Sequence, residues 1–468
     1  MATTMHTSKT IPGPRTLPLL GWRASIFKLY SDPFRYLSHL YATYGPVVTL
    51  SKGDASYICA FGPELNFALL SNPTLFEVSA GPMEKLAQDT ALVRVGGHSL
   101  QMMRREKHKQ QRRLMQPAFH KQQVAHLLTD MVTLTSLMLD SWQERTEIQL
   151  YREMELLTRD IVVKTLFGLD DKAEIEHLGS LLERMVSSLM LALIAPVNLP
   201  GTPYARMQHM AEELETALQA MIARKRSQGE TTDLLSVLIH AHDEDGATLS
   251  DLELVSHAFT LFTAGHATTT DALTWALFLL SQHPQVTADL LDEVDGVLHG
   301  EAPTIEQLQQ LPLLDYVIKE SLRLLPPGGI GQRKAMAPCE LEGYELAEGT
   351  TIIYSEFLTH RLSELYEQPD RFLPQRWATL KRTAYEYLPF SAGQHRCIGS
   401  EFALLEEKIT LAMLIQRYRL EGISNARIDL GLEMRPKHGM TMRIFPQDRQ
   451  FKRVPVRGNI RDLVVLAE

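Results

Sequence analysis

The sequence predicts a mainly α-helical protein with a small β-rich region. Apolar residues recur at helical spacing through most of residues 100–300, which is the period of amphipathic helices. The longest predicted helix begins at Ser250, where Ser250 and Glu253 form a capping box, and no proline interrupts it before Pro284. At 1.5 Å per residue this helix is roughly 50 Å long, enough to cross a whole domain. After Pro326 the pattern changes to short strands.

The other elements follow from local signals. Two strands are predicted near the N-terminus, at Val47–Leu50 and Ser56–Ala60, and a basic helix at Glu106–Gln116. No repeat or flexible linker divides the chain, so we expect one domain over residues 1–468. Beyond residue 300 the predicted elements are a capping box of Thr304 and Gln307, a helix over Leu313–Leu325, strands at Glu340–Glu342, Glu345–Leu346 and Thr351–Tyr354, an irregular Asp370–Gly393, and a last helix from Ser400 to about Tyr418.

Composition excludes several classes of protein. The net charge of −9 argues against nucleic acid as a partner, because binding a phosphate backbone needs a basic surface. The three cysteines are far apart and lack CxxC spacing, so neither a disulfide framework nor a zinc site is indicated. No apolar run approaches the ~20 residues of a membrane-spanning helix, and the N-terminus lacks the apolar core of a signal peptide. We therefore expect a cytoplasmic protein without a membrane anchor.

One cysteine lies in a loop punctuated by glycine, just before the last predicted helix. The loop runs from Phe390 to Gly399 and contains Gly393 and Cys397. Glycines permit backbone turns and close approaches that a Cβ would block. A helix N-terminus favours a thiolate, and a thiolate is a good metal ligand. The alternative is a buried structural cysteine, which is the usual role of a lone Cys.

The spacing of this loop resembles the haem-binding loop of the cytochrome P450 family: Phe390, two residues, Gly393, three residues, Cys397, one residue, Gly399. The resemblance covers about residues 10–445 and implies the mainly helical P450 fold. It also implies haem b with Cys397 as the iron ligand, whose electron donation favours O–O cleavage. Residues 446–468 extend beyond the resemblance, and their role is not predicted.

Two further motifs resemble the structural network of the same family. Glu320 and Arg323 are spaced i, i+3 on a predicted apolar helix, so the two side chains can pair. Arg376 follows Pro374 in a turn that resembles the family's third member. The resemblance implies that Glu320, Arg323 and Arg376 support the haem loop without taking part in catalysis. Taken alone, Glu-x-x-Arg is usually a solvated pair.

The long helix contains Ala264, Gly265 and Thr268, which resemble the family's oxygen-binding groove. A mid-helix glycine costs about 1 kcal/mol relative to alanine, and threonine hydroxyls compete for backbone groups, so a local bulge is expected. The simpler alternative is that Thr268 bonds to its own backbone. The family usually has an acid before this threonine, whereas this chain has Ala267. Asp271, on the same helix face, or His266 is expected to replace that acid in proton delivery.

Cationic side chains are expected to hold the haem propionates. His108 and Arg112, spaced i, i+4 on the basic helix, resemble a propionate-binding pair of bacterial members of the family. His395 and Arg333 resemble two further propionate ligands, and a solvated charge is the alternative for each of the four. The same helix region is rich in basic residues, which suggests electrostatic docking of an acidic electron donor: Arg104, Arg105, Lys107, Lys109, Arg112 and Arg113.

The resemblance also predicts the substrate pocket. Its walls are expected at about Ser79–Gly97, Phe259–Thr268, Gly328–Gln332 and Gly439–Thr441, with Phe262, Ile330 and Met440 prominent. Because these stretches are mainly apolar or small, the substrate is expected to be hydrophobic, either a fatty acid or a terpenoid.

The implied activity is insertion of one oxygen atom from O2 into such a molecule, with catalysis involving Ala264, Gly265, Thr268 and Asp271. Electrons are expected from a separate ferredoxin or flavodoxin-type donor with its reductase. One alternative is a haem-thiolate peroxygenase, isomerase or dehydratase that needs no redox partner, which Ala267 favours. The other is a haem carrier or sensor without enzymatic activity, which the groove in the long helix argues against.

Overall fold

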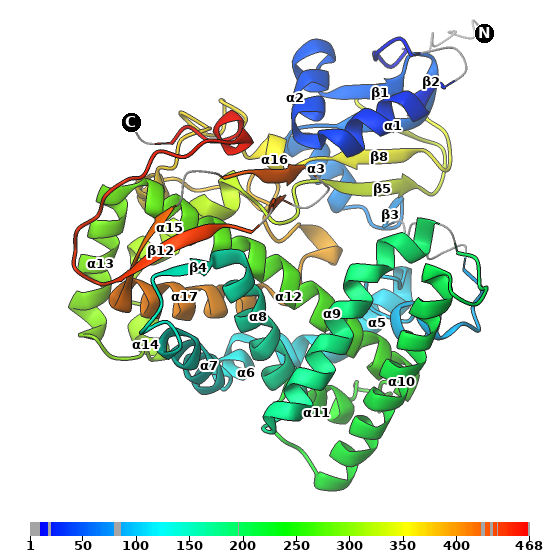
Figure 1. Ribbon diagram of the computed structural model, residues 1–468. Helices are drawn as coiled ribbons and strands as arrows, with labels where there is room; N and C mark the ends of the chain where they lie inside the picture. Colours follow the sequence, from blue (N-terminus) through cyan, green and yellow to red (C-terminus); the bar gives the residue numbers. More distant parts are fainter. Residues whose placement is uncertain are drawn as a thin grey trace, which may run out of the picture.

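The computed structural model describes residues 10–16, 20–78, 86–194, 196–422, 426–430, 434–437 and 439–466. Most of these residues are helical, and the strands form small sheets, which confirms the predicted fold class (Figure 1). The helices before residue 250 are α1 (Trp22–Ser31), α2 (Pro33–Tyr44), α3 (Pro63–Leu70), α4 (Ala91–Gly96), α5 (Arg105–Met115), α6 (Lys121–Ala125), α7 (Leu128–Asp140), α8 (Leu150–Phe167), α9 (Lys172–Ile194), α10 (Pro203–Gln228) and α11 (Leu234–His240).

Helix α12 (Asp251–Gln282) is the central element of the fold. The predicted capping box starts it: Glu253 N donates to Ser250 Oγ (3.3 Å), and Ser250 N donates to Glu253 Oε2 (3.0 Å). The helix packs against α4, α8, α10, α15 and α17 (Figure 1), so it is buried almost all round. The helices that follow it are α13 (Pro284–Leu298), α14 (Ile305–Leu308), α15 (Pro312–Leu324), α16 (Glu356–Thr359) and α17 (Ser400–Arg417).

A five-stranded sheet lies beside α1 and α2, at the top of Figure 1. Its order is β1-β2-β8-β5-β3, and the central strand β8 runs antiparallel to β5, with Arg333 opposite Ile352. This pairing carries Arg333 to the edge of the helical part of the molecule. The strands are β1 (Val47–Ser51), β2 (Asp54–Ala60), β3 (Phe76–Glu77), β5 (Gly331–Ala335) and β8 (Thr351–Tyr354).

The other strands form three smaller sheets. Strands β6 and β7 are joined by Glu342 and Gly343, both with positive φ, as a tight hairpin turn requires. Strand β12 lies between β4 and β9, and β10 pairs with β11. Their bounds are β4 (Glu147–Gln149), β6 (Cys339–Leu341), β7 (Tyr344–Leu346), β9 (Tyr418–Gly422), β10 (Ile428–Leu430), β11 (Met434–Pro436) and β12 (Thr441–Pro446).

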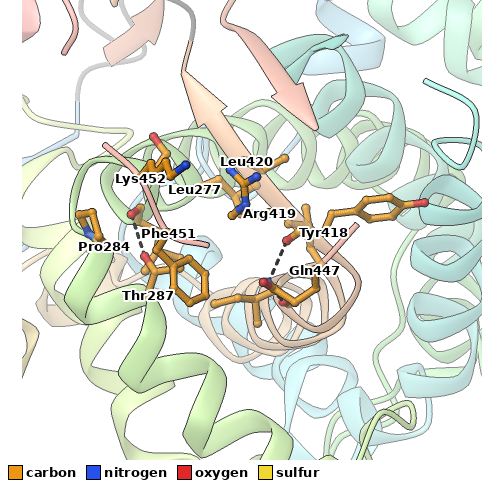
Figure 2. A pocket seen from close by; sticks show the side chains of 13 residues that line it. Leu277, Pro284, Thr287, Tyr418, Arg419, Leu420, Gln447, Phe451 and Lys452 are labelled. Carbon is orange, nitrogen blue, oxygen red and sulfur yellow. Dashed lines mark hydrogen bonds between the residues drawn. The ribbon is translucent and has the colours of Figure 1, made fainter. Parts of the chain in front are cut away.

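The segment after β12, for which the sequence predicted no role, wraps over the outside of the fold. Gln447 Nε2 donates to the Ile415 carbonyl at the end of α17 (2.6 Å). Phe451 lies beside Thr287 in a small pocket of about 30 Å³ (Figure 2). Further along, Val465 N donates to the Asp370 carbonyl (2.8 Å). The segment therefore joins α13 and α17 to the irregular region before the cysteine loop.

None of the described helices is both long and apolar enough to cross a membrane.

Candidate active site

A cavity of about 570 Å³ lies at the centre of the molecule. Its walls come from α5, α8, α12 and α17, from β5, and from the loop that precedes α17. This volume is in the range of sites that enclose a cofactor or a small molecule. The cavity brings together many of the residues singled out in the sequence: His108, Arg112, Ala264, Gly265, Thr268, Arg333, Phe390, His395, Cys397 and Gly399.

The cysteine loop is held in a tight turn. Cys397 N donates to the Phe390 carbonyl (2.8 Å), which closes the loop. Gly393 has a φ of +71°, and a Cβ at this position would overlap the Leu70 carbonyl oxygen, so only glycine fits. Gly399 differs from the expectation: its φ of −87° suits any residue, and a Cβ would meet no described atom within 4 Å. Gly399 instead leaves open space in the cavity wall beside Cys397.

The Cys397 side chain has exposed surface, and that surface faces the cavity. Burial within the protein raises the pKa of the thiol, while the Gly399 N–H and the guanidinium groups of Arg112 and Arg396 oppose this rise. The helix N-terminus alone therefore does not produce the thiolate expected from the sequence. A metal ion bound at the sulfur would supply the missing positive charge and displace the proton.

Four cationic or imidazole side chains from three elements meet at the cavity. Burial, followed by the charge of Arg112, lowers the pKa of His108 to about 4. Burial, with contributions from His108, Arg333 and Arg112, lowers the pKa of His395 to about 3. The two imidazole rings lie 4.1 Å apart between centroids. At neutral pH both imidazoles are therefore neutral and can donate hydrogen bonds, while Arg112 and Arg333 supply the positive charge. A ligand with carboxylates, such as a haem, fits this carboxylate-binding cluster.

The predicted structural network is present, with Glu320 and Arg323 fully buried and Arg376 partly buried. Arg323 makes two hydrogen bonds to the Glu320 carboxylate, Nε to Oε2 and Nη2 to Oε1, both 2.9 Å. Arg376 Nε donates to Glu320 Oε1 (3.0 Å), as the resemblance implied. Trp377 Nε1 donates to Glu320 Oε2 (2.9 Å), a contact that the sequence analysis did not foresee. Arg323 also donates to the carbonyls of His360 and Pro369, so the network holds the irregular region in place.

Helix α12 passes the cavity without the expected bulge. It is α-helical throughout, and Thr268 Oγ1 donates to the Ala264 carbonyl (2.5 Å), which is the simpler of the two arrangements considered. Ala264, Gly265 and Thr268 all face the cavity. Thr269 also lines it, and its buried hydroxyl has no hydrogen-bond partner within the part of the chain that the structure describes.

The two candidates for the missing acid are both buried in contacts with other elements. His266 Nε2 donates to the Glu155 carbonyl on α8 (3.0 Å), and burial lowers the pKa of this imidazole to about 4. His266 is thus directed away from Thr268. Asp271 is buried beside β11, with its Oδ2 3.9 Å from Arg435 Nε. Neither residue lines the described part of the cavity wall.

The three residues singled out for the substrate pocket do not lie on the described cavity wall. Phe262 is fully buried and packs on His266, with ring centroids 5.3 Å apart. The preceding residue, Leu261, does face the cavity. Because successive residues of an α-helix are rotated by about 100°, the Phe262 side chain points in a different direction. Ile330 and Met440 pack into the core instead. Of the expected wall Ser79–Gly97, residues 79–85 lie outside the described residues.

The basic stretch around α5 is largely paired within the chain. Arg105 Nε lies 2.6 Å and Arg104 Nε 3.6 Å from the buried carboxylate of Glu77. Lys107 lies 3.3 Å from Glu253. Much of the positive charge that suggested a docking surface is therefore offset locally.

The structure adds cavity residues that sequence reasoning missed. Glu356 and Glu407 line the wall with buried carboxyls, and burial raises the pKa of each to about 8. His257 also lines it, accepting at Nδ1 from Leu100 N (3.3 Å) while its Nε2 donates to Gln111 Oε1 (2.9 Å). No local motif marks these positions, because each looks like an ordinary polar residue of a helix.

The fold, the cysteine loop and the cationic cluster define the class of proteins that hold haem through a cysteine thiolate. The family model described as Cytochrome P450 matches residues 11–439, and the chain belongs to this family. It is 33% identical to cyclooctat-9-en-7-ol 5-monooxygenase of Streptomyces melanosporofaciens over 89% of this chain and 90% of that protein. It is 31% identical to pentalenene oxygenase of Streptomyces avermitilis, over 89% and 92% of the two chains.

The same fold is seen in the structure of retinoic acid bound cyanobacterial CYP120A1, with a TM-score of 0.81 and 24% identity, over 94% of this chain and 100% of that chain. The chain is thus a cytochrome P450 monooxygenase, whose reaction uses O2, a substrate and a redox partner.

Proposed function

We propose that this enzyme inserts one oxygen atom from O2 into a terpenoid, using haem b and electrons from a separate ferredoxin or flavodoxin-type donor with its reductase. The observation that carries the proposal is the cavity itself. Cys397 lies on its wall together with a carboxylate-binding cluster and with the Ala264–Thr268 stretch of α12. When bound, the haem supplies reductive activation of O2 at its iron.

The distribution of charge favours a terpenoid over a fatty acid. The cavity wall formed by α8 and α12 and by the segment after α4 is mainly apolar, and it includes Leu100, Met102, Val162 and Leu261. The arginines that line the described wall come from α5, β5 and the cysteine loop: Arg112, Arg333 and Arg396. In this proposal Arg112 and Arg333 hold the haem carboxylates, so no cation remains on the apolar wall to bind a fatty-acid carboxylate. The names of the relatives, which concern terpenoids, agree with this reasoning.

The remaining residues have separate tasks. Cys397 holds the iron, and His108, Arg112, Arg333 and His395 orient the cofactor. Thr268 presents a hydroxyl to the cavity, and it must release the Ala264 carbonyl before it can donate a proton there. Asp271 lies within one helical turn of Thr268 and resupplies that proton through water, in place of the acid absent at position 267.

The test is product formation in 18O2 with a ferredoxin, its reductase and NADPH. Panels of cyclic terpenes, terpene alcohols and long-chain fatty acids are supplied as substrates. The proposal expects a terpenoid product that carries one 18O atom and no turnover of fatty acids. Products formed with hydrogen peroxide alone, and none with the electron donors, would instead show a peroxygenase, the alternative that Ala267 favours. Haem binding with no turnover of any substrate would indicate a carrier or sensor.

A further inference from the structure

Glu356 is a buried acid that the activity described so far does not use. It is the first residue of α16, directly after β8, with Ser355 as the N-cap of that helix. Its side chain lines the central cavity although the residue is buried. Its Oε2 has no hydrogen-bond partner among the residues that the structure describes. A buried polar atom left in this state is destabilising, so a ligand that satisfies it is favoured.

The surroundings of Glu356 belong to the carboxylate-binding cluster. Strand β5, which carries Arg333, pairs with β8, which ends at Tyr354. Arg333 lies over the Tyr354 ring, with its Cζ 5.4 Å from the ring centroid, and it also lines the cavity. Burial raises the pKa of Glu356 to about 8, and the charge of Arg333 offsets only part of this rise. The Glu356 carboxyl is thus mainly protonated at neutral pH.

We infer that Glu356 is a further haem-binding residue, which donates a hydrogen bond from its carboxyl O–H to a haem carboxylate beside Arg333. This inference rests on the proposed haem b, because that cofactor supplies the two carboxylates. An acid O–H bound to a carboxylate oxygen is a short, charge-assisted hydrogen bond, and it satisfies the oxygen that has no partner. Arg333 neutralises the remaining charge of the carboxylate.

The hydrogen bond from Glu356 to the haem carboxylate is expected to weaken as the pH rises. Below the pKa of Glu356 the acid donates and holds the cofactor. Above it, two carboxylates face each other and repel, so haem release accelerates as the pH rises. The neighbouring groups do not titrate in this window: His395 and His108 have pKa values near 3 and 4, and that of Tyr354 is raised to about 12.

Among the described cavity residues, Glu407 is the one other group whose titration could produce the same pH dependence of haem release. It lies on α17, its pKa is also raised to about 8, and burial alone causes the rise. None of the four residues of the carboxylate-binding cluster lies on α17, so Glu407 is placed outside that cluster. The Glu407→Gln variant is therefore the matched control for any buried carboxyl of this cavity.

The experiment measures the rate of haem transfer from the purified holoenzyme to excess apomyoglobin between pH 6.5 and 9.5. The wild-type rate of haem transfer is expected to rise about tenfold across this range, because the loss of one charge-assisted hydrogen bond changes an equilibrium or rate by about that factor. Glu356→Gln, whose amide still donates, should release haem slowly at every pH. Glu356→Ala should release it quickly at every pH, and Glu407→Gln should behave like the wild type.

The inference is overturned if the wild-type rate does not rise, if Glu356→Gln keeps the rise, or if Glu407→Gln removes it. The absorption spectrum recorded before each transfer separates this result from the wider proposal. If the wild-type protein carries no thiolate-ligated haem, the proposed function itself fails. If the haem is bound as expected and Glu356→Gln behaves like the wild type, only the role of Glu356 is wrong.

Discussion

The Arg323 guanidinium and the Glu320 carboxylate form two parallel hydrogen bonds of 2.9 Å, and both side chains are fully inaccessible to solvent. Bidentate geometry makes this the strongest kind of ion pair, while burial makes each partner costly without the other. The same carboxylate accepts from Arg376, Trp377 and the Leu373 N–H. Glu320 thus fixes the irregular region through which the chain reaches the cysteine loop.

Removing one partner of this pair should destabilise the protein strongly. Glu320→Gln leaves a buried guanidinium without its counter-charge and should lower the free energy of unfolding by about 3–5 kcal/mol. The measurement is denaturant unfolding of the purified variant. The control is Arg443→Gln, which breaks an exposed ion pair with Glu147 at 3.6 Å and should change stability by less than about 1 kcal/mol. Equal effects of the two variants would show that the Glu320 network does not support the fold.

Gly393→Ala should disrupt the cysteine loop. The new Cβ would overlap the Leu70 carbonyl and strain a φ of +71°. Haem content per protein, measured by absorption, is therefore expected to fall severalfold. Gly300→Ala provides the control for strain alone, because Gly300 has a φ of +85° and no atom near its Cβ position. If the Gly393 variant retains full haem content, the close approach to Leu70 is not required for the site.

Asp271→Asn should uncouple electron consumption from product formation. The substitution keeps the shape of the side chain but removes the ionisable proton, so product formed per NADPH should fall about tenfold or more. The substrate dissociation constant should not change, because Asp271 does not lie on the described cavity wall. His266→Gln is the control, since His266 donates to Glu155 on α8. Unchanged coupling in the Asp271 variant would exclude it as the proton relay.

His360 should make the protein sensitive to acid. Burial and the charges of Arg323 and Arg361 lower its pKa to about 3, and its neutral Nε2 accepts from the Leu388 N–H (2.8 Å). The unfolded state, with a pKa near 6.5, binds the proton more readily, so stability falls as the pH drops below 6.5. This group contributes a slope of up to ~1.4 kcal/mol per pH unit.

The test is unfolding by urea at several pH values between 4 and 7. His360→Gln keeps an acceptor for Leu388 but cannot titrate, so its stability should depend less steeply on pH than that of the wild type. Identical slopes for the two proteins would contradict the assignment.

The motifs with fixed local spacing could be predicted from the sequence. The cysteine loop and the pairing of Glu320 with Arg323 depend on residues a few positions apart, and the structure has both as expected. Which side of a helix faces a cavity depends on tertiary packing, so the sequence could not show that Phe262 is buried against His266. Glu356 has the sequence of an ordinary acid at a helix start, and only the fold buries it beside Arg333.

Long-range pairing explains why the basic stretch around α5, which suggested a docking surface, is largely neutralised within the chain. Glu77 and Arg105 are distant in the sequence, and strand β3 brings Glu77 to α5. A count of charges along the chain cannot show this neutralisation.

The most direct test of the whole account is the absorption spectrum of the reduced protein with carbon monoxide, for the wild type and for Cys397→Ser. Thiolate ligation predicts a strongly red-shifted Soret band in the wild type that is absent from the variant. A wild-type protein that binds no haem, or one that shows the band of a histidine-ligated haem, would contradict the assignment of Cys397 as the iron ligand.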